Sequence, residues 1–278
     1  MNATQPKLRR PLKVGLVGGL AAVVLAGVPA TEASAKSTIT LSGSTSVAPL
    51  AAKLARRYVK ETRGRVGFKL LQGGSDIGVS DVSRGRVTLG MASRDPKPGD
   101  PGGIFFNRIS RDAICLASNK ANNVSNVSQA QVQQIFGGGV RNWSQVPGAT
   151  VGGTINLFTR TAASGTQDAF QKIFLGTTKV SSTASQRASN GLVQQSVKSS
   201  RTGIGYLSLA FTNGLHDIRY KGVSCNLRNA KAGTYGGVRN FWLVSRGRIG
   251  GAAKRWLRWI RNDSDARRIT ASEWVPLR

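Results

Sequence analysis

Residues 160–167 of the chain read RTAASGTQ, and they stand between a strand pattern and a helix pattern. The strand pattern covers 155–158, and the helix pattern places Phe170, Ile173 and Phe174 on one face. Free backbone N–H groups at the start of a helix, together with the positive end of the helix dipole, favour a bound anion. The hydroxyls of Ser164 and Thr166 and the cation of Arg160 add donors at the same place, so the run predicts a cradle for a small oxyanion.

Two further turns repeat this strand–turn–helix arrangement. One is SGSTS, residues 42–46, between a strand pattern at 38–41 and a helix pattern at 47–58. The other is GGSDIG, residues 73–78, after a strand pattern at 66–70. In open α/β sheets, ligands bind at the carboxyl ends of the strands, so the three turns are expected to face one cleft. Arg160 would grip two oxygens of a tetrahedral anion with its planar fork of donors.

Each turn also has a purely structural interpretation. Ser46 could serve only as the N-cap of the following helix, a position that serine favours. Ser75 and the glycines before it could form only a tight turn, and Arg160 alone could be a surface ion-pair partner. The repetition of one arrangement after separate strands favours the anion site.

The rest of the mature sequence alternates strand and helix patterns. Further strand patterns cover 87–89, 113–117, 203–207 and 241–244, and further helix patterns cover 128–136 and 251–261. Repeated βα units predict an α/β fold with a largely parallel sheet. The helix at 251–261 is cationic and amphipathic, and we expect it to pack on the body of the protein rather than on a membrane or nucleic acid.

Residues 1–35 are predicted to be a signal peptide that is cleaved on export. Basic residues at 7, 9, 10 and 13 precede an apolar run over 14–28, which ends near the small residues ASA at 33–35. The run is too short to span a membrane comfortably. Paired Arg9 and Arg10 leave Sec and twin-arginine export both open. No cysteine lies near the cleavage site, so we expect a periplasmic or secreted protein without a lipid anchor.

The chain is strongly basic, with 40 Lys and Arg residues against 12 Asp and Glu residues and a formal net charge of +28. Such a bias attracts anions in general, whether phosphate, acidic polysaccharide, anionic lipid or nucleic acid. The basic residues are scattered rather than blocked, as they would be on an ordinary solvated surface. The charge alone leaves open a second hypothesis, a cationic surface protein that binds acidic polymers or membranes.

Cysteine and histidine are scarce. Cys115 and Cys225 are the two cysteines, and in an oxidising compartment they could form a disulfide or remain buried thiols. His216, the single histidine, is expected in a surface loop without partners for a zinc site or a Ser-His-Asp triad. We therefore expect no metal, no cofactor and no catalytic residue, and a phosphatase or other hydrolase is the weakest hypothesis.

Five motifs in order resemble the phosphate-binding proteins of bacterial ABC phosphate importers (PstS-like), within type 2 of the periplasmic solute-binding superfamily. They are SGSTSVAPL at 42–50, GSDIG at 74–78, GMASR at 90–94, IFGGG at 135–139 with Asn142-Trp143, and Arg160 with SGT at 164–166 and Phe170. The resemblance covers nearly all of the mature chain. It implies a monomeric binding protein, with no specific nucleic-acid partner, that captures inorganic phosphate and delivers it to the membrane permease of an ABC importer.

The resemblance also implies a two-lobe Venus-flytrap fold, each lobe a mixed, mostly parallel sheet flanked by helices. Lobe 1 would combine residues 36–112 with 239–278, and lobe 2 would be residues 113–238. Carried onto this sequence, the phosphate contacts of the family, one of them a backbone N–H at Val47, fall on Thr45, Ser46, Val47, Ser75, Ser93, Arg160, Ser164, Gly165 and Thr166.

The sequence departs from the family pattern at two places. Ser93 stands where better-known members have an aspartate, whose carboxylate accepts the proton of hydrogen phosphate. Selectivity for phosphate over sulfate would then depend on another carboxylate, such as Asp76 or Asp95. Ala162 and Ala163 stand where an acidic residue often orients the arginine.

Overall fold

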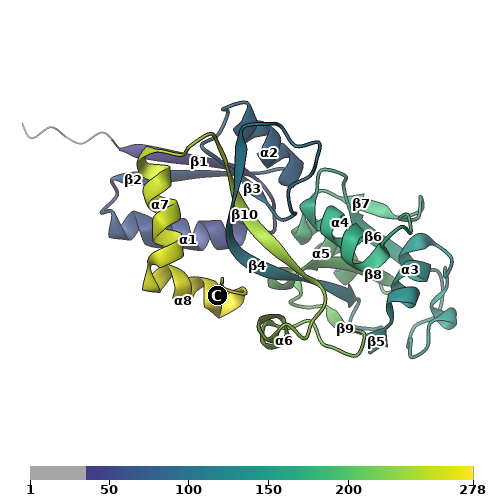
Figure 1. The fold of residues 1–278 in the computed structure, drawn as a ribbon. Helices are drawn as coiled ribbons and strands as arrows, with labels where there is room; N and C mark the ends of the chain where they lie inside the picture. The colour runs from purple at the N-terminus through teal and green to yellow at the C-terminus, as the bar shows by residue number, and fades with distance from the viewer. Residues whose placement is uncertain (1–35, 278) are drawn as a thin grey trace, which may run out of the picture. The chain divides into compact units, whose positions relative to one another are not determined.

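The computed structural model describes residues 36–277 (Figure 1). The predicted signal peptide, residues 1–35, lies outside the described residues. Helices and strands alternate along the described part of the chain, which confirms the predicted α/β class. Within this part, no helix is both long enough and apolar enough to cross a membrane.

Eight strands follow one another in a hydrogen-bonded path in the order β2-β1-β3-β10-β4-β8-β6-β7, and β9 joins it by pairing with β4 and β5. The pairs β1–β2, β1–β3, β6–β8 and β6–β7 are parallel, whereas β10 and β4 pair antiparallel with their neighbours. The strands are β1 (Ser37–Gly43), β2 (Val66–Gln72), β3 (Leu89–Ala92), β4 (Ile104–Ser118), β5 (Asn126–Val127), β6 (Asn156–Arg160), β7 (Ser185–Arg187), β8 (Gly203–Ser208), β9 (His216–Tyr220) and β10 (Val238–Arg246).

The long strand β4 changes partner along its length. Its residues 104–113 pair with β10, whereas 114–118 pair with β8, and 116–118 pair also with β9. The sequence predicted only the second part, 113–117, because the first part is less buried and lacks a continuous apolar run. β4 and β10 run side by side (Figure 1), and they connect the two hydrophobic cores described next.

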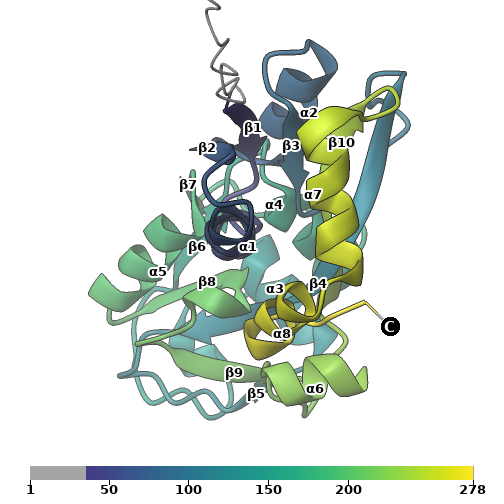
Figure 2. The same cartoon turned by 90° about the vertical axis from the view of Figure 1, so that its left-hand side faces the viewer.

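One hydrophobic core, here called the terminal core, combines buried residues between Ile39 and Ile109 with others between Phe241 and Trp274. Helices α1 (Ala48–Glu61), α7 (Gly251–Asn262) and α8 (Ser264–Glu273) pack on it (Figure 2). The ring of Phe68 meets that of Trp256 at a centroid distance of 4.7 Å. Since α7 buries its apolar face here, the cationic helix packs on the protein itself, as predicted. Helix α2 (Ser75–Ser83) covers a smaller cluster of valines nearby.

The other core, the central core, is built from buried residues between Ala113 and Tyr235, joined by Val275. Its centre is aromatic, with the rings of Phe170 and Tyr206 stacked at a centroid distance of 3.7 Å. The helices and helical turns of this region are α3 (Gln129–Gly137), η1 (Trp143–Gln145), α4 (Gly165–Phe170), the π-helical turn η2 (Gln171–Leu175), α5 (Asn190–Ser199), η3 (Leu209–Phe211) and α6 (Leu227–Ala232).

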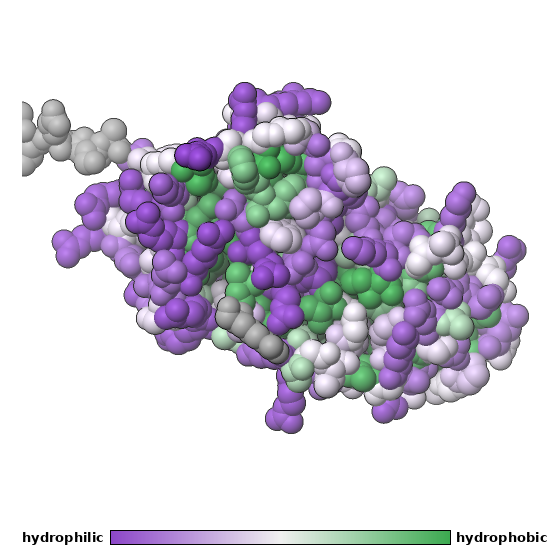
Figure 3. All heavy atoms as spheres, viewed as in Figure 1, coloured by the Kyte–Doolittle hydropathy of each residue, from purple (hydrophilic) through white to green (hydrophobic). Residues whose placement is uncertain are grey.

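The surface seen in Figure 3 is mostly hydrophilic, and apolar patches interrupt it, one of them just below α4 in this view. Exposed basic residues account for much of the polar surface, and α7 contributes Lys254, Arg255, Arg258 and Arg261. The strong positive charge of the chain therefore lies mainly on its surface, whereas a few cations are buried, as described below.

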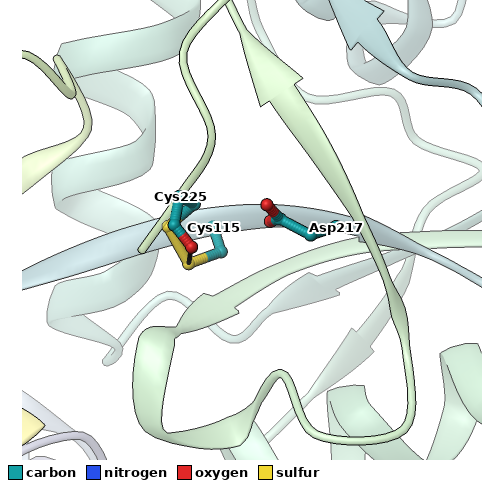
Figure 4. Close-up of side chains that lie close together, drawn as sticks. All are labelled: Cys115, Asp217 and Cys225. Carbon is teal, nitrogen blue, oxygen red and sulfur yellow. Dashed lines mark hydrogen bonds between the residues drawn. A yellow bond between two sulfur atoms is a disulfide. The ribbon is translucent and has the colours of Figure 1, made fainter. Parts of the chain in front are cut away.

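Cys115 in β4 and Cys225, just before α6, form a disulfide beside Asp217 (Figure 4). The thiolate ligands that a metal would need at this cluster are thus consumed by the S–S bond. The prediction of a surface loop at His216 was wrong, because His216 begins β9 and is half-buried. The turn residues Asn213 and Gly214 obscured this short strand, which depends on pairing with β4 rather than on local propensity.

Candidate anion-binding site

The first predicted turn connects β1 to α1. Ser44 Oγ accepts hydrogen bonds from the backbone N–H groups of Ser46, at 3.2 Å, and Val47, at 3.3 Å. Ser44 thus satisfies N–H groups just before the helix, whose N-cap, Val47, has no side-chain cap, and the Ser46 hydroxyl is not used as an N-cap. The N–H of Val47, predicted to contact the anion, donates to Ser44 in this structure.

The second predicted turn holds Ser75 at the start of α2 and Ser93 just after β3. The N–H of Ser93 donates to Ser75 Oγ at 3.0 Å, and Ser93 Oγ accepts from Ser44 Oγ at 2.9 Å. All three serines are buried. These hydrogen bonds connect the first two turns into one polar surface.

The third predicted turn begins with Arg160 at the end of β6. Its Nη2 donates to Thr45 Oγ1 at 3.2 Å and to the carbonyl of Ala188 at 2.9 Å, and its Nε donates to the carbonyl of Arg187 at 3.1 Å. Two backbone carbonyls thus orient the guanidinium, in place of the acidic side chain that Ala162 and Ala163 exclude. The backbone N–H of Arg160 donates to the hydroxyl of Tyr206 at 3.0 Å.

Ser164 and Gly165 have structural roles where α4 begins. Ser164 Oγ accepts from the N–H groups of Thr166 and Gln167, so it is the N-cap of the helix. A Cβ on Gly165 would lie 2.9 Å from the carbonyl carbon of Ser93 and closer still to Ser75 Oγ. Only glycine lets the start of α4 approach these two serines so closely.

The structure brings the three turns together. Ser46 Oγ and Thr166 Oγ1 share a hydrogen bond at 3.0 Å, and Arg160 reaches both Thr45 and Thr166. Ser93 Oγ accepts a hydrogen bond from Arg239 Nη1 at 3.4 Å, and Ser75 Oγ accepts one from the N–H of Ser93. The nine predicted residues are all buried around this point: Thr45, Ser46, Val47, Ser75, Ser93, Arg160, Ser164, Gly165 and Thr166.

Sequence reasoning missed three polar residues at the same place. Arg239 of β10 donates to Thr166 Oγ1 at 2.7 Å and to Ser46 Oγ at 2.9 Å. Asn190, at the start of α5, donates to Ser46 Oγ at 2.8 Å and to Thr45 Oγ1 at 3.1 Å. Asp112 of β4 accepts from Arg239 Nη2 at 2.9 Å and from Ser208 Oγ at 3.0 Å.

A signal for Arg239 was present in the sequence. In β10, Arg239 shares the buried register with Phe241 and Leu243, whereas the residues between them are only half-buried. A charged residue on the apolar face of a strand needs a buried partner, and so it indicates a functional or structural polar site. Asn190 stands in a polar stretch and offered no comparable signal.

Burial dominates the electrostatics of the site. Burial, together with the neighbouring charge of Arg239 and against an opposing effect of Tyr206, lowers the pKa of Arg160 from 12.5 to about 10. Burial also lowers the pKa of Arg239 and raises that of Asp112, while the attraction between these two opposes both shifts. A bound anion would reverse the shift of Arg160, because a nearby negative charge favours the protonated guanidinium.

The carboxylates proposed as alternatives to the missing aspartate do not reach the site. Asp76 pairs with Arg94 at 2.7 Å, and Asp95 accepts a hydrogen bond from Asn240 at 2.8 Å. Asp112 is the carboxylate that contacts the site, and Arg239 engages one of its oxygens. The groups that converge here are therefore mainly donors: two guanidiniums, an amide and the hydroxyls of Thr45, Ser46, Ser93 and Thr166.

The chain is similar to known phosphate-binding proteins. The phosphate-binding protein PstS of Bacillus subtilis is 24% identical over 252 residues, which cover 88% of this chain and 83% of the relative. A solved Clostridium perfringens structure, named for a phosphate ABC transporter substrate-binding protein with bound phosphate, is 25% identical with a TM-score of 0.82 and covers 87% of this chain and 100% of that one.

A phosphate transport receptor structure from Vibrio cholerae, 24% identical, has a TM-score of 0.68 and covers 86% of this chain and 100% of that one. The sequence pattern described as a PBP superfamily domain matches residues 28–260, which is most of the chain. The fold, with its mixed sheet and flanking helices, is the one that these binding proteins share. The chain belongs to the PBP superfamily of periplasmic binding proteins.

Proposed function

We propose that the chain captures inorganic phosphate, or a similar tetrahedral oxyanion, and delivers it to an ABC importer. One observation carries the proposal: Arg160 and Arg239 are 2% and 5% exposed, and in the described part of the chain only Asp112 pairs with either of them. An uncompensated buried charge is costly. A bound anion supplies the missing negative charge.

The surrounding groups suit a tetrahedral anion. Hydroxyls of Thr45, Ser46 and Thr166 now accept hydrogen bonds from the two guanidiniums and from Asn190. An anion would take over as the acceptor, so the hydroxyls could turn and donate to it. The site holds no histidine, and none of its serines has a base beside it, so the chain acts as a binding protein and not as an enzyme.

Binding would occur between two lobes, 36–112 with 239–278 and 113–238. The separate terminal and central cores support this division, as does the change of partner in β4 at residues 113 and 114. Thr45, Ser46, Ser75 and Ser93 would then close on Arg160 and Thr166, with β4 and β10 as the hinge. In the closed form, the hydrogen bond between Ser46 and Thr166 would join the two lobes.

The partners and the location follow from the same role. Residues 1–35 would direct export as a signal peptide and then be cleaved. The mature protein would remain monomeric and present its closed form to the membrane permease of the importer. The B. subtilis and C. perfringens relatives, which are named for phosphate binding and phosphate transport, support this role.

Calorimetry on ligand-stripped protein tests the function. Phosphate should bind to the wild type, and Arg160→Ala should weaken binding roughly 100-fold, because it removes charged hydrogen bonds from a buried site. Arg201→Ala, which removes an exposed arginine of the same region, should bind phosphate like the wild type. A parallel titration with sulfate measures the selectivity that Ser93 leaves open.

The proposal fails if the wild type does not bind phosphate, or if Arg160→Ala binds it equally well. The competing hypothesis of a cationic surface protein predicts something different. Acidic polymers would then bind in a manner that survives Arg160→Ala and weakens steeply with added salt. Phosphate in a buried site should be much less sensitive to salt.

A further inference from the structure

A cavity of about 500 Å³ lies beside the anion site and shares Arg239 with it, whereas the other residues of its lining are not among the proposed phosphate contacts. Its walls come from the loop 94–97 after β3, from β4 and β10, and from α4 with the π-helical turn that follows it. The central core contributes Ala169, and the two strands that connect the cores contribute Arg111, Val238, Arg239 and Asn240.

Close backbone packing separates this cavity from the anion site. Gly165 lies against the backbone of Ser93 and Arg94, where an added Cβ would be 3.0 Å from the nitrogen of Arg94. Nearby, the N–H of Asp76 donates to the carbonyl of Ala163 at 3.1 Å. A molecule in the cavity would therefore sit next to a bound phosphate without replacing it.

Most of the charged groups in the cavity wall already have partners. Arg94 pairs with Asp100 at 2.6 Å, and Lys97 pairs with Asp168 at 2.5 Å. Arg239 is engaged by Asp112, and Asp95 accepts hydrogen bonds from Asn240 and Trp242.

Two cations in the wall are exceptions. In the described residues, neither Arg111 nor Lys172 forms an ion pair, although both line the cavity. Arg111 belongs to β4 and is half-buried, and Lys172 lies at the exposed side of the π-helical turn. The cavity thus retains an excess of positive charge.

The remainder of the wall is apolar. Ala169, Ile173 and Val238 contribute side chains without polar atoms, and Pro96 adds a ring. An apolar patch also reaches the surface just below α4 in Figure 3. An inorganic anion would leave such walls unused, whereas a neutral apolar molecule would leave the two cations unpaired.

We propose that this cavity binds a small organic anion, a carboxylate carried on an aromatic or short aliphatic body. The carboxylate contacts Arg111 and Lys172, and the body packs on Ala169, Ile173 and Val238. This second ligand binds alongside phosphate, and its binding does not depend on what occupies the anion site.

Calorimetry on protein saturated with phosphate tests the proposal, with benzoate as the probe and benzamide as its uncharged match. Benzoate should bind with a dissociation constant in the millimolar range, which is usual for a ligand of this size. Benzamide, which has the same ring but no charge, should bind at least about tenfold more weakly, because it cannot pair with the two cations.

Variants locate the site. Arg111→Gln and Lys172→Gln should each weaken benzoate binding several-fold and leave phosphate binding unchanged, whereas Lys120→Gln, which removes an exposed lysine elsewhere, should change neither. Thermal melting of each variant checks that it is folded.

Any one of four results would overturn the proposal. They are displacement of benzoate by phosphate, equal binding of benzamide, an unchanged benzoate affinity in both cavity variants, and no benzoate binding at all. Phosphate binding is measured in a separate titration. A failure of the proposed phosphate function can therefore be distinguished from a failure of the proposed benzoate site.

Discussion

The terminal and central cores supply different kinds of groups to the anion site. The terminal side contributes the neutral hydroxyls of Thr45, Ser46, Ser75 and Ser93, whereas the central side contributes the cation of Arg160, the amide of Asn190 and the hydroxyl of Thr166. Arg239 comes from β10, which connects the two. The charge of Arg160 thus comes from the central side, and most of the hydroxyls come from the terminal side.

The interactions that hold these groups in place also differ between the two sides. Arg160 is held through the hydroxyl of Tyr206, whose ring is stacked on Phe170 in the centre of the aromatic core. The hydroxyls of Ser44, Ser75 and Ser93 are held mainly by one another and by nearby backbone N–H groups. A rigid cation therefore faces a set of hydroxyls that can rotate. Arg160 would hold the anion in one position, and the hydroxyls would turn to donate hydrogen bonds to it.

The largest expected effect is on stability, at the point where the two cores meet. Arg239→Met should destabilise the fold by about 3 to 5 kcal/mol, because it leaves Asp112 buried without a charged partner. The double variant Arg239→Met with Asp112→Leu should recover most of this loss. Urea unfolding measures both. If the double variant were as unstable as the single one, the cost would come from lost packing and not from the unpaired carboxylate.

The disulfide should stabilise mainly the central core. Replacing Cys115 and Cys225 by alanine opens a crosslink between residues 110 apart in the sequence and should cost about 2 to 4 kcal/mol. Hydrogen exchange followed by mass spectrometry should then show faster exchange in α3 and β8, with little change in α1 and α7. Equal acceleration in all four elements would mean that the two cores unfold as one unit.

A smaller effect, on phosphate binding, is expected from a change at Tyr206, which contacts the backbone of Arg160. Tyr206→Phe removes the acceptor of the Arg160 backbone N–H while keeping the stacked ring. It should weaken phosphate binding by about 1 kcal/mol, or roughly fivefold, since a neutral hydrogen bond is lost. Tyr220→Phe is the matched control, because Tyr220 is buried in the same core and does not contact the site. If calorimetry gave the same phosphate affinity for both variants, the positioning role of Tyr206 would be contradicted.

The smallest effect concerns Asp217 and pH. Burial raises the pKa of this carboxyl from 3.8 to about 6, while the N–H of Cys225 and the neighbouring His216 favour its ionised form. Because the folded-state pKa is raised, protonated Asp217 contributes stability that is present below 3.8 and is lost as the pH rises through 6. Asp217→Asn should therefore melt at a higher temperature than the wild type above pH 6, with the difference shrinking in acid. A constant difference at all pH values would rule out titration of Asp217 as its cause.

Much of the fold was predictable, since strands such as β1 and β8 and helices such as α1 and α7 show their periods clearly in the sequence. Strand β9 was not, because it depends on pairing with β4, which is distant in the chain, and α5 was missed although Ser189 caps it and Val193 and Val197 share its buried face. The turns of the site carry local motifs, so Ser46, Ser75 and Arg160 could be chosen from the sequence.

The remaining site groups have no such local motif. Asp112 and Arg239 face each other only because β4 and β10 pair, across 127 positions of the chain. Asn190 reaches Ser46 across 144 positions. Long-range pairing of this kind depends on the register of the sheet, which no short window of sequence contains.

The path of β4 and β10 also has a consequence for the order of events during synthesis and export. The central core is built almost entirely from one continuous segment, so it can form as soon as that segment is available. The terminal core needs Phe241, Trp256 and Trp274, which are made last. The terminal core, which contains the first strands of the chain, therefore cannot form before the last helices are available. We expect the newly exported protein to fold its central core first and its terminal core afterwards.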